Sequence, residues 1–304
     1  MNSVLTSIAP TGSKPQRSIP ATPKDLLAAV LQTNQAEDPR TRKMLDALIR
    51  HLHAFATEVK LSYEELHKGL DFMVRVGQAT NPKRHEGILL AHILGLATLV
   101  LLMDAKAVLA AGGTEPALIG PFWRANQPVL PNGARIASGA TEGSPLFVSG
   151  RVVSIDGTPI EGARVEAWQA APSGLYENQD PEQEDMNLRA VFLTDAQGRF
   201  WFESVKPAGY GVPIDGPCGD LLALQKRDHM RPAHLHFIAI AAEHKVLTTQ
   251  IFDANDPYAY SDAAFGAVGS LLRQFEPRND GTFHLDVELR LEPGKTQLPT
   301  PPLS

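Results

Sequence analysis

Cysteine is almost absent from this sequence: Cys218 is the only one among 304 residues. A single thiol cannot form an internal disulfide, so a secreted scaffold held together by disulfides is excluded, and we expect a cytoplasmic protein. Cys218 lies in the turn-like sequence Gly-Pro-Cys-Gly at residues 216–219. This setting predicts a small buried side chain and not a catalytic nucleophile.

Positive charge and long apolar runs are also scarce. The chain has 28 lysines and arginines against 34 acidic residues, a formal net charge of −6 and a pI near 5.9. This balance argues against nucleic acid or an anionic membrane as the main partner. The first twenty residues lack the apolar core of a signal peptide.

The longest apolar run, residues 87–103, contains His92 and stops before Asp104. It falls short of the roughly 18–20 apolar residues that a membrane span requires. We therefore expect no membrane span, and we interpret the run as a buried helix that also packs against another subunit. The sequence leaves open whether this helix binds lipid.

The first third of the chain has the pattern of helices joined by short connections. Residues 1–21 have low hydrophobicity and no periodicity, which predicts a disordered arm. After it we expect a helical N-terminal domain over 22–130. The predicted helices begin at Thr22-Pro23, span about 40–59, run from a capping box at 62–65 to near Gly77, and follow Asn81-Pro82 over about 83–103.

The pattern changes after Gly112-Gly113, where glycine and proline separate short runs rich in β-branched and aromatic residues. Such runs predict an antiparallel β-sandwich over 131–293, followed by a loose tail at 294–304, and the fold class is α+β, mainly β. Asp156-Gly157 and, more weakly, Gln197-Gly198 predict hairpin turns. The predicted strands are 146–153, 163–168, 189–194, 199–203, 234–240, 246–252 and 283–289.

Two histidines two residues apart, His234 and His236, open one of these strands. The side-chain period of a strand is two, so both leave the same face and can share one metal ion. His51 and His53 have the same spacing, but they lie in a helical pattern, where two residues are separated by roughly 200° around the axis. A His-x-His pair on a strand is still more often structural than metal-binding, so the pair alone does not decide.

Four segments, in order, carry a resemblance to a known family. They are residues 188–200, 207–217, 231–237 (sequence Arg-Pro-Ala-His-Leu-His-Phe) and 247–252. This series resembles the intradiol ring-cleavage dioxygenases, in the catechol/hydroxyquinol 1,2-dioxygenase branch and closest to hydroxyquinol 1,2-dioxygenase. The likeness spans about 120–290 and extends weakly into the helical third. It implies a homodimer formed through the N-terminal helices.

The resemblance also implies one ferric iron per subunit, held by Tyr176, Tyr210, His234 and His236. Each tyrosine taken alone would more often be a packed turn residue. Two phenolates are hard anionic ligands that favour ferric iron, whereas a zinc site more often uses cysteine, histidine and carboxylate. The chemistry of the residues therefore agrees with the implied metal.

The implied reaction takes a small aromatic diol or triol and O2 to a cis,cis-muconate-type diacid. By the same resemblance, Tyr210 leaves the metal and helps to take up the substrate protons. Arg231 lies over the ring and stabilises its negative charge, and Gln250 hydrogen-bonds Arg231. The alternative for Arg231 is an ordinary surface salt bridge.

The implied substrate pocket has walls from both domains. The segments 75–78 and 120–123 favour hydroxyquinol over plain catechol, but His92 stands where an acidic residue is usual in the hydroxyquinol group. A catechol or substituted-catechol 1,2-dioxygenase and, in a different class, an iron-free β-sandwich binding module remain alternatives. The predicted wall residues are Leu89, His92, Leu118, Ile119, Phe122, Ala263 and Ala264.

Overall fold

The structure is a computed structural model that describes residues 19–81, 84–139 and 141–299. The chain divides into two compact units, Met1–Asp71 and Phe72–Ser304. Most of the predicted disordered arm and the last residues of the predicted tail lie outside the described residues. The predicted domain boundary at residue 130 stays a prediction.

The first unit consists of α1 (Pro23–Gln32), α2 (Pro39–Glu58) and the beginning of α3 (Tyr63–Ala79). Their starts follow the predicted capping chemistry. The Thr22 hydroxyl accepts from the Asp25 N–H at 3.2 Å and the Asp25 carboxylate accepts from the Thr22 N–H, and the Ser62–Glu65 pair does the same. His51 and His53 both lie on α2, as predicted.

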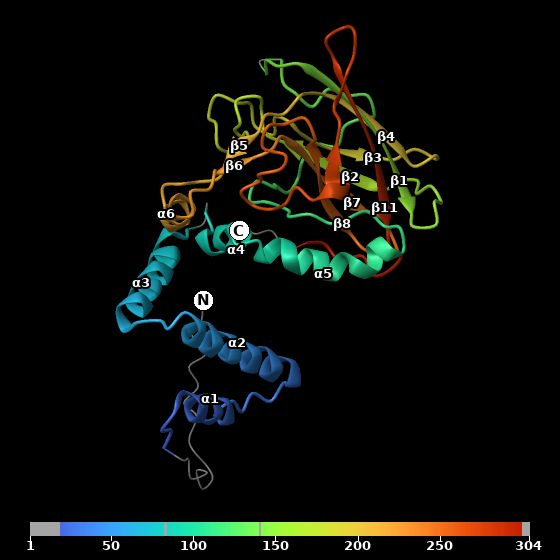
Figure 1. The fold of residues 1–304 in the computed structure, drawn as a ribbon. Coiled ribbons are helices and arrows are strands. Elements are labelled where there is room, and N and C mark those ends of the chain that lie inside the picture. Colours follow the sequence, from blue (N-terminus) through green and yellow to red (C-terminus); the bar gives the residue numbers. More distant parts are fainter. Residues whose placement is uncertain (1–18, 82–83, 140, 300–304) are drawn as a thin grey trace. The chain divides into compact units, whose positions relative to one another are not determined.

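The predicted helix over 83–103 is wrong as a single element. The chain forms α4 (Glu86–Ile93) and α5 (Leu96–Ala110), bent by 69° (Figure 1). Gly95 makes the break because it adopts a φ of 69°, in the left-handed region that favours glycine, and the Phe265 ring lies 3.4 Å from where a Cβ would stand. In the described part of the chain no single helix is long and apolar enough to span a membrane, and this bent pair passes only when taken together.

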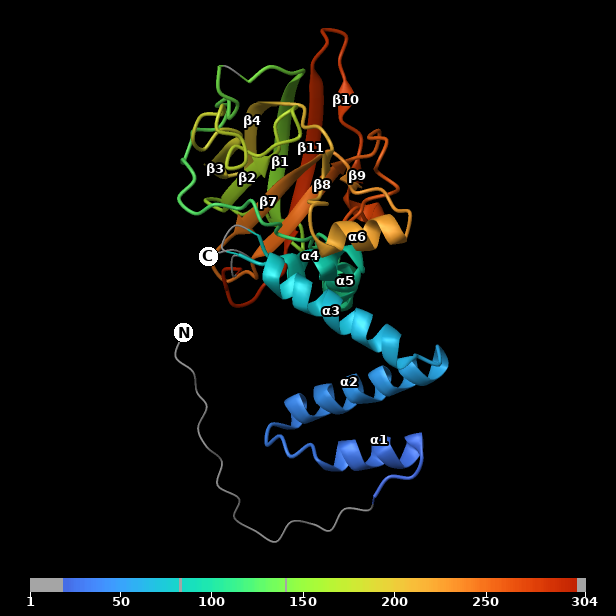
Figure 2. The same cartoon turned by 90° about the vertical axis from the view of Figure 1, so that its left-hand side faces the viewer.

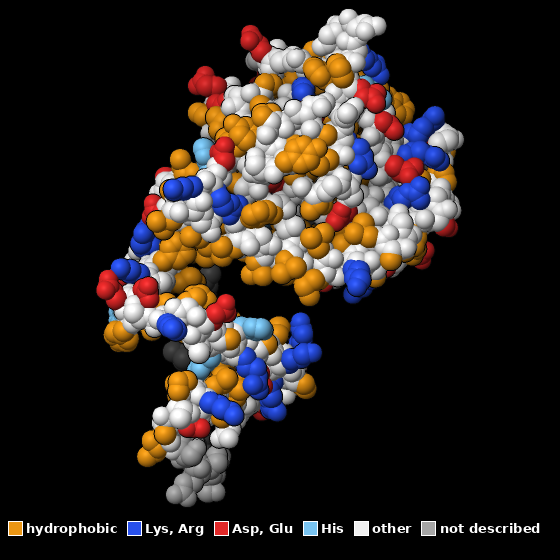
Figure 3. Space-filling view, in the orientation of Figure 1, with side chains coloured by type: hydrophobic (Ala, Val, Ile, Leu, Met, Phe, Trp, Pro, Cys, Tyr) orange, Lys and Arg blue, Asp and Glu red, His pale blue; other side chains and the backbone are white. Residues whose placement is uncertain are grey.

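Helix α5 buries only part of its apolar surface within this chain, and its predicted packing against another subunit stays a prediction. Only Thr98 and Ala105 are buried, while Leu99 and Met103 are 53% and 68% exposed. The space-filling view shows hydrophobic side chains gathered along this edge of the second unit (Figure 3).

The second unit is a two-layer β-sandwich, with α4 and α5 at one end of it (Figures 1 and 2). One sheet has the order β10-β11-β1-β4 and the other β3-β2-β7-β8-β9. The first contains β10 (Glu276–Pro277), β11 (Phe283–Leu291), β1 (Pro145–Ser154) and β4 (Arg199–Val205). The second contains β3 (Arg189–Leu193), β2 (Arg164–Gln169), β7 (His234–Ile240), β8 (Leu247–Asp253) and β9 (Leu272–Arg273), which follows the short helix η1 (Gly269–Leu271). A further pair is β5 (Tyr210–Gly211) and β6 (Met230–Arg231), with α6 (Pro217–Leu224) between them in sequence.

Two details of the predicted sandwich need correction. Its sheets are mixed, because β1 pairs with β11 in parallel and β8 with β9 in parallel. The turn at Gln197-Gly198 is not a hairpin within one sheet, since β3 and β4 belong to different sheets. Phe192 and Phe202 face each other in the core between those sheets, with ring centroids 5.0 Å apart. The turn at Asp156-Gly157 is confirmed, because Val153 and Pro159 form an antiparallel bridge across it.

Strand β7 connects the core to the other face of its sheet. Leu235, Phe237 and Ala239 enter the core between the two sheets, so the period of two directs His234 and His236 to the opposite face. Both histidines are nevertheless buried, at 2% and 1% exposure, because loops cover that face.

Candidate metal and substrate site

The two histidines of β7 meet on this covered face. The Nε2 atoms of His234 and His236 lie 3.1 Å apart. The Nδ1 atom of His234 lies 2.7 Å from the Pro232 carbonyl oxygen, which can only accept, so Nδ1 carries the proton. The Nε2 lone pair of His234 is therefore free to bind a metal.

Two tyrosines reach the same point from separate loops. Tyr176 lies in the connection between β2 and β3, and its Oη is 2.8 Å from His236 Nε2. Tyr210 begins β5, and its ring meets the Tyr176 ring edge-on at 5.4 Å between centroids. The Tyr210 ring is also 5.5 Å from that of His234. All four residues that the sequence singled out as metal ligands are thus gathered in one buried cluster.

Burial sets the protonation of this cluster. It lowers the pKa of His236 well below its ordinary value, with added repulsion from His234 and Arg231, so this imidazole is neutral. Burial also raises the pKa of Tyr176 well above its ordinary value, and the neighbouring Tyr210 adds to the effect. A bound cation reverses this second effect, because it stabilises the phenolate.

The donor set suits a ferric ion. Among residues 19–81, 84–139 and 141–299, no three histidine, cysteine or carboxylate side chains form a metal-binding group. The two neutral imidazoles are joined instead by two phenols, which become hard anionic ligands when deprotonated. The residues present therefore fit the metal that the family resemblance implies.

Arg231 lies beside the cluster and is not a surface residue. It is 4% exposed, its Nη1 is 3.4 Å from Tyr210 Oη, and its Nη2 donates to Gln250 Oε1 at 3.1 Å. Gln250 Nε2 donates to the Leu118 carbonyl oxygen at 2.6 Å and lies 3.2 Å from His236 Nδ1. Burial opposes the charge of Arg231, but the attraction of Asp262 and Tyr210 outweighs it and raises the guanidinium pKa.

One group of predicted wall residues packs directly on the tyrosine–histidine cluster. The Phe122 ring stacks on Tyr176, with centroids 4.4 Å apart, and Ile119 packs against the same cluster. Leu118 is buried and held through its carbonyl oxygen by Gln250.

The other wall residues gather on the Arg231 side. Leu89 packs in a cluster that contains Ala263, and Ala264 follows it in the chain. His92 is close enough to Arg231 for that charge to affect it. Burial first, and Arg231 second, lower the pKa of His92 to about 4, so this imidazole is neutral at pH 7.

Several buried residues at the site were not predicted. Asp262 pairs with Arg231, Trp168 stacks on His236, and Glu177, next to Tyr176, pairs with Arg189. Acidic residues and tryptophans are scattered along the sequence, and burial among charged partners leaves no local signal. The register that places Trp168 opposite His236 is likewise a property of the sheet.

The chain matches known proteins along most of its length. A family model described as "Dioxygenase" matches residues 118–293, and one described as "Catechol dioxygenase N terminus" matches 38–112. A 6-chlorohydroxyquinol 1,2-dioxygenase of Cupriavidus pinatubonensis is 39% identical over 266 residues, covering 88% of this chain and 95% of that protein. A catechol 1,2-dioxygenase of Candida albicans is 38% identical over 240 residues, 78% of this chain and 79% of that protein.

A solved structure gives the same result. The hydroxyquinol 1,2-dioxygenase of Pseudomonas putida superimposes with a TM-score of 0.81 and 34% identity, over 89% of this chain and 99% of the other. Helices followed by a β-sandwich, with this sequence similarity, define the class: the protein is a dioxygenase. It belongs to the intradiol ring-cleavage dioxygenase family, in the hydroxyquinol branch.

Proposed function

We propose that this enzyme uses O2 to cleave hydroxyquinol, or a closely related hydroxylated catechol, between its two adjacent oxygen-bearing carbons. The product is a cis,cis-muconate-type diacid, and the cofactor is one ferric ion per subunit. The observation that carries the proposal is the convergence of two buried tyrosines and two buried histidines beside a buried arginine.

Tyr176, Tyr210, His234 and His236 would hold the iron. When bound, ferric iron supplies the Lewis acidity that makes a catecholate ring reactive toward O2. The oxygen of Tyr210 takes up a proton as the substrate binds, and Arg231 Nη1, 3.4 Å from that oxygen, stabilises negative charge on the ring. Gln250 holds Nη2 of the same guanidinium.

The walls orient the ring and exclude water. Phe122 and Ile119 cover the tyrosine side, while Leu89, Ala263 and Ala264 lie on the side of Arg231. The neutral imidazole of His92 is the group available to hydrogen-bond a third ring hydroxyl. A catechol or substituted-catechol 1,2-dioxygenase is the second candidate, because the similarity to a catechol 1,2-dioxygenase is nearly as high.

The helical region supports a homodimer in the same proposal. Helix α2 has exposed Leu45, Leu48, Leu52 and Phe55 at helical spacing, and α5 has its own exposed apolar side chains. A second copy would remove such surface from water. The boundaries 22–130 and 131–293 and a cytoplasmic location, which the single thiol supports, complete the proposal.

Colour and iron content test the metal. Ferric tyrosinate absorbs visible light strongly, so iron-loaded protein should be coloured and contain about one iron per chain. Tyr176→Phe should shift or bleach the band, whereas Tyr63→Phe, at a tyrosine that is 77% exposed on α3, should not. A preparation that stays colourless and iron-free after reconstitution would favour the binding module.

Oxygen uptake with equal concentrations of hydroxyquinol, catechol, 4-methylcatechol and chlorocatechols tests the substrate. We expect hydroxyquinol to have the highest kcat/KM. His92→Leu should lower the ratio of hydroxyquinol to catechol by about tenfold, the typical effect of one lost hydrogen bond to a buried polar group. A clear preference for unsubstituted catechol would remove the substrate proposal and leave the reaction type standing.

A further inference from the structure

Asp262 is a buried carboxylate on the segment that carries the wall residues Ala263 and Ala264. Its side chain is 3% exposed. Oδ1 accepts hydrogen bonds from Arg231 Nε at 3.0 Å and from the Ala264 N–H at 3.0 Å. Oδ2 accepts from Arg231 Nη2 at 3.2 Å and from the N–H groups of Gly266 and Ala267 at 2.9 and 3.0 Å. One carboxylate therefore binds both the guanidinium and the wall segment.

The hydrogen bonds of Arg231 hold Nε and Nη2 of its guanidinium and leave Nη1 available to the substrate. Nε and Nη2 are bound by Asp262, and Nη2 also donates to Gln250. Among the residues that the structure describes, Nη1 has only the long 3.4 Å contact to Tyr210 Oη. Because the guanidinium is planar and rigid, fixing Nε and Nη2 also fixes the direction of Nη1.

Gly266 provides the space for this arrangement. A Cβ at this position would stand 2.7 Å from Arg231 Nη2 and 3.2 Å from Asp262 Oδ2. The guanidinium thus occupies the volume that any side chain at position 266 would need. The absence of a side chain at 266 and the carboxylate at 262 serve the same placement of Arg231.

We propose that Asp262 is a positioning residue for ring cleavage: it directs Arg231 Nη1 toward the reaction centre and, through the same carboxylate, fixes the substrate wall at 263–267. This inference rests on the proposed function. Without the carboxylate, the buried charge of Arg231 keeps two hydrogen-bond partners from the set above, Gln250 Oε1 at 3.1 Å and Tyr210 Oη at 3.4 Å, and neither binds Nε. Nε is then released and Nη2 keeps one bond, so the guanidinium can rotate and Nη1 loses its fixed direction toward the ring.

Kinetics test the inference with four variants. Asp262→Asn should lower kcat by about 30- to 100-fold, the size of effect expected when a charged donor is misplaced. Gly266→Ala leaves every charge in place, so it should lower kcat with KM within about threefold of wild type. In the Arg231→Ala background, adding Asp262→Asn should lower kcat by less than about a further threefold. The effects of two residues that act through one another are not additive.

Asp253→Asn is the matched control. Asp253 is also buried, pairs with Lys206 at 2.8 Å and accepts the N–H of Asn255 at 3.0 Å, but it does not bind Arg231. It should destabilise the protein as Asp262→Asn does, yet keep kcat within about threefold of wild type. If Asp262→Asn lowers kcat in the Arg231→Ala background by the same factor of about 30- to 100-fold as in wild type, the inference is overturned.

Nitrogen-15 NMR of arginine side chains in metal-free protein gives a readout that does not depend on activity. A buried Nε–H bonded to a carboxylate exchanges slowly with water, and Arg231→Lys assigns this signal against that of Arg189, whose Nε also donates to a carboxylate. The Arg231 signal should shift and exchange faster in Asp262→Asn and in Gly266→Ala. If Asp262→Asn does not fold, Gly266→Ala decides alone.

An Arg231 signal unchanged in Gly266→Ala, or already fast in wild type, would overturn the inference. Failure of the proposed function looks different: the wild-type enzyme would cleave none of the catechols, whatever the NMR signal does.

Discussion

The indole of Trp168 lies flat against the imidazole of His236, with ring centroids 4.6 Å apart and an angle of 11° between the planes. The two residues are Cα partners on β2 and β7, so the sheet register brings them together. Stacking restricts rotation of the imidazole about its χ2, and it leaves Nε2 directed at Tyr176 Oη. Trp168 thus supports the geometry of a proposed metal ligand from the neighbouring strand.

Comparing Trp168→Phe with Trp168→Leu separates the effect of ring stacking on His236 from the effect of a smaller side chain. The indole N–H has no hydrogen-bond partner among the described residues, so Phe loses little polar interaction and keeps a flat ring. Leu loses the ring. We expect Trp168→Leu to lower the iron content well below that of Trp168→Phe, although both lose about 1–4 kcal/mol of stability from the smaller side chain. Equal iron contents in the two variants would contradict an orienting role for the ring.

The parts of the fold that the sequence could predict depend on local chemistry. The capping residues Thr22 and Ser62 define helix starts. The side-chain period of two in a strand places His236 and Phe237 on opposite faces of the sheet. The family resemblance added the tyrosines, which no local spacing connects to the histidines. These predictions needed only neighbouring residues or a known order of motifs.

The parts that could not be predicted depend on residues far apart in the chain. The parallel pairing of β1 with β11 joins segments about 140 residues apart, and no turn residue signals it. The break at Gly95 was hidden because the apolar run continues across it, and glycine within a helical pattern is often tolerated. Asp262 has no sequence signal because its role depends on Arg231, 31 residues earlier.

Glu177→Gln should weaken both stability and metal binding. The Glu177 carboxylate accepts from Arg189 Nε at 2.7 Å and from Arg124 Nη1 at 2.5 Å, and Arg189 Nη1 holds the Phe122 carbonyl oxygen at 2.6 Å. Removing one partner of a buried ion pair leaves an uncompensated charge and costs about 3–5 kcal/mol. Because Glu177 follows Tyr176, the iron content should fall as well. Urea unfolding and iron analysis measure the two effects.

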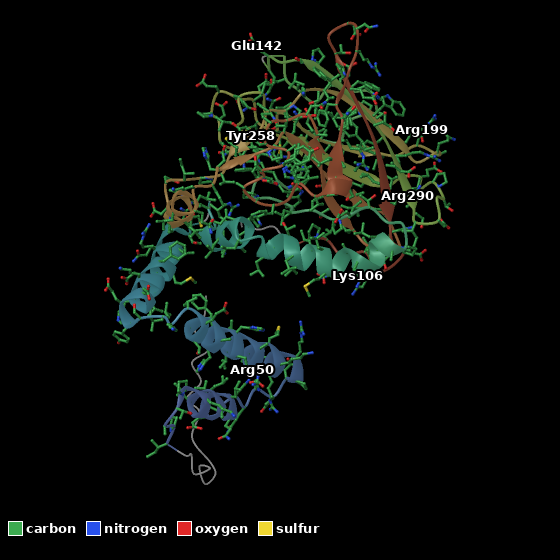
Figure 4. All side chains as sticks on the ribbon, in the orientation of Figure 1. Arg50, Lys106, Glu142, Arg199, Tyr258 and Arg290 are labelled. Atoms are coloured by element: carbon green, nitrogen blue, oxygen red, sulfur yellow. The ribbon has the colours of Figure 1, made fainter. Side chains whose placement is uncertain are left out.

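Glu288→Gln is the control for that variant. Glu288 pairs with Arg290 at 2.7 Å, but both side chains are about 40% exposed, and Arg290 lies at the edge of the sandwich (Figure 4). An exposed pair contributes about 0–1 kcal/mol. If Glu177→Gln costs no more than Glu288→Gln, the buried network does not hold the loop of Tyr176.

His92 should make the stability of the metal-free protein depend on pH. Burial lowers its pKa from 6.5 to about 4, so between these values the unfolded chain binds a proton that the folded chain does not. The contribution of His92 is therefore fully present above pH 6.5 and is lost as the pH falls from 6.5 toward 4, up to roughly 3 kcal/mol. His92→Leu should reduce the slope of the stability–pH curve in this window without abolishing it, because burial also lowers the pKa of His236. His51→Leu, at an exposed histidine of α2, is the control for replacing an imidazole by leucine outside a buried site.

The only thiol should be inert in the folded protein. Cys218 is fully buried, and burial, followed by the charge of Glu86, raises its pKa to about 12. At pH 8 only about one thiol in ten thousand is then ionised, and the thiolate is the reactive form. A chromogenic disulfide reagent should titrate one thiol per chain in denaturant and close to none without it. Rapid reaction of the folded protein would show that α6 opens readily.

Gly150→Ala should destabilise the sandwich by overpacking. Gly150 lies on β1 between Phe200 of β4 and Val287 of β11, and a Cβ there would overlap the Phe200 ring and stand 2.8 Å from a Val287 methyl group. Backbone pairing on both sides prevents β1 from moving away, so the added methyl group should cost about 1–3 kcal/mol. Gly269→Ala is the control, because nothing lies within 4 Å of a Cβ at that exposed position. In thermal unfolding, Gly150→Ala should have a lower Tm than wild type, and Gly269→Ala should not. An equal Tm for the two variants would mean that the sheets can separate enough to admit a methyl group.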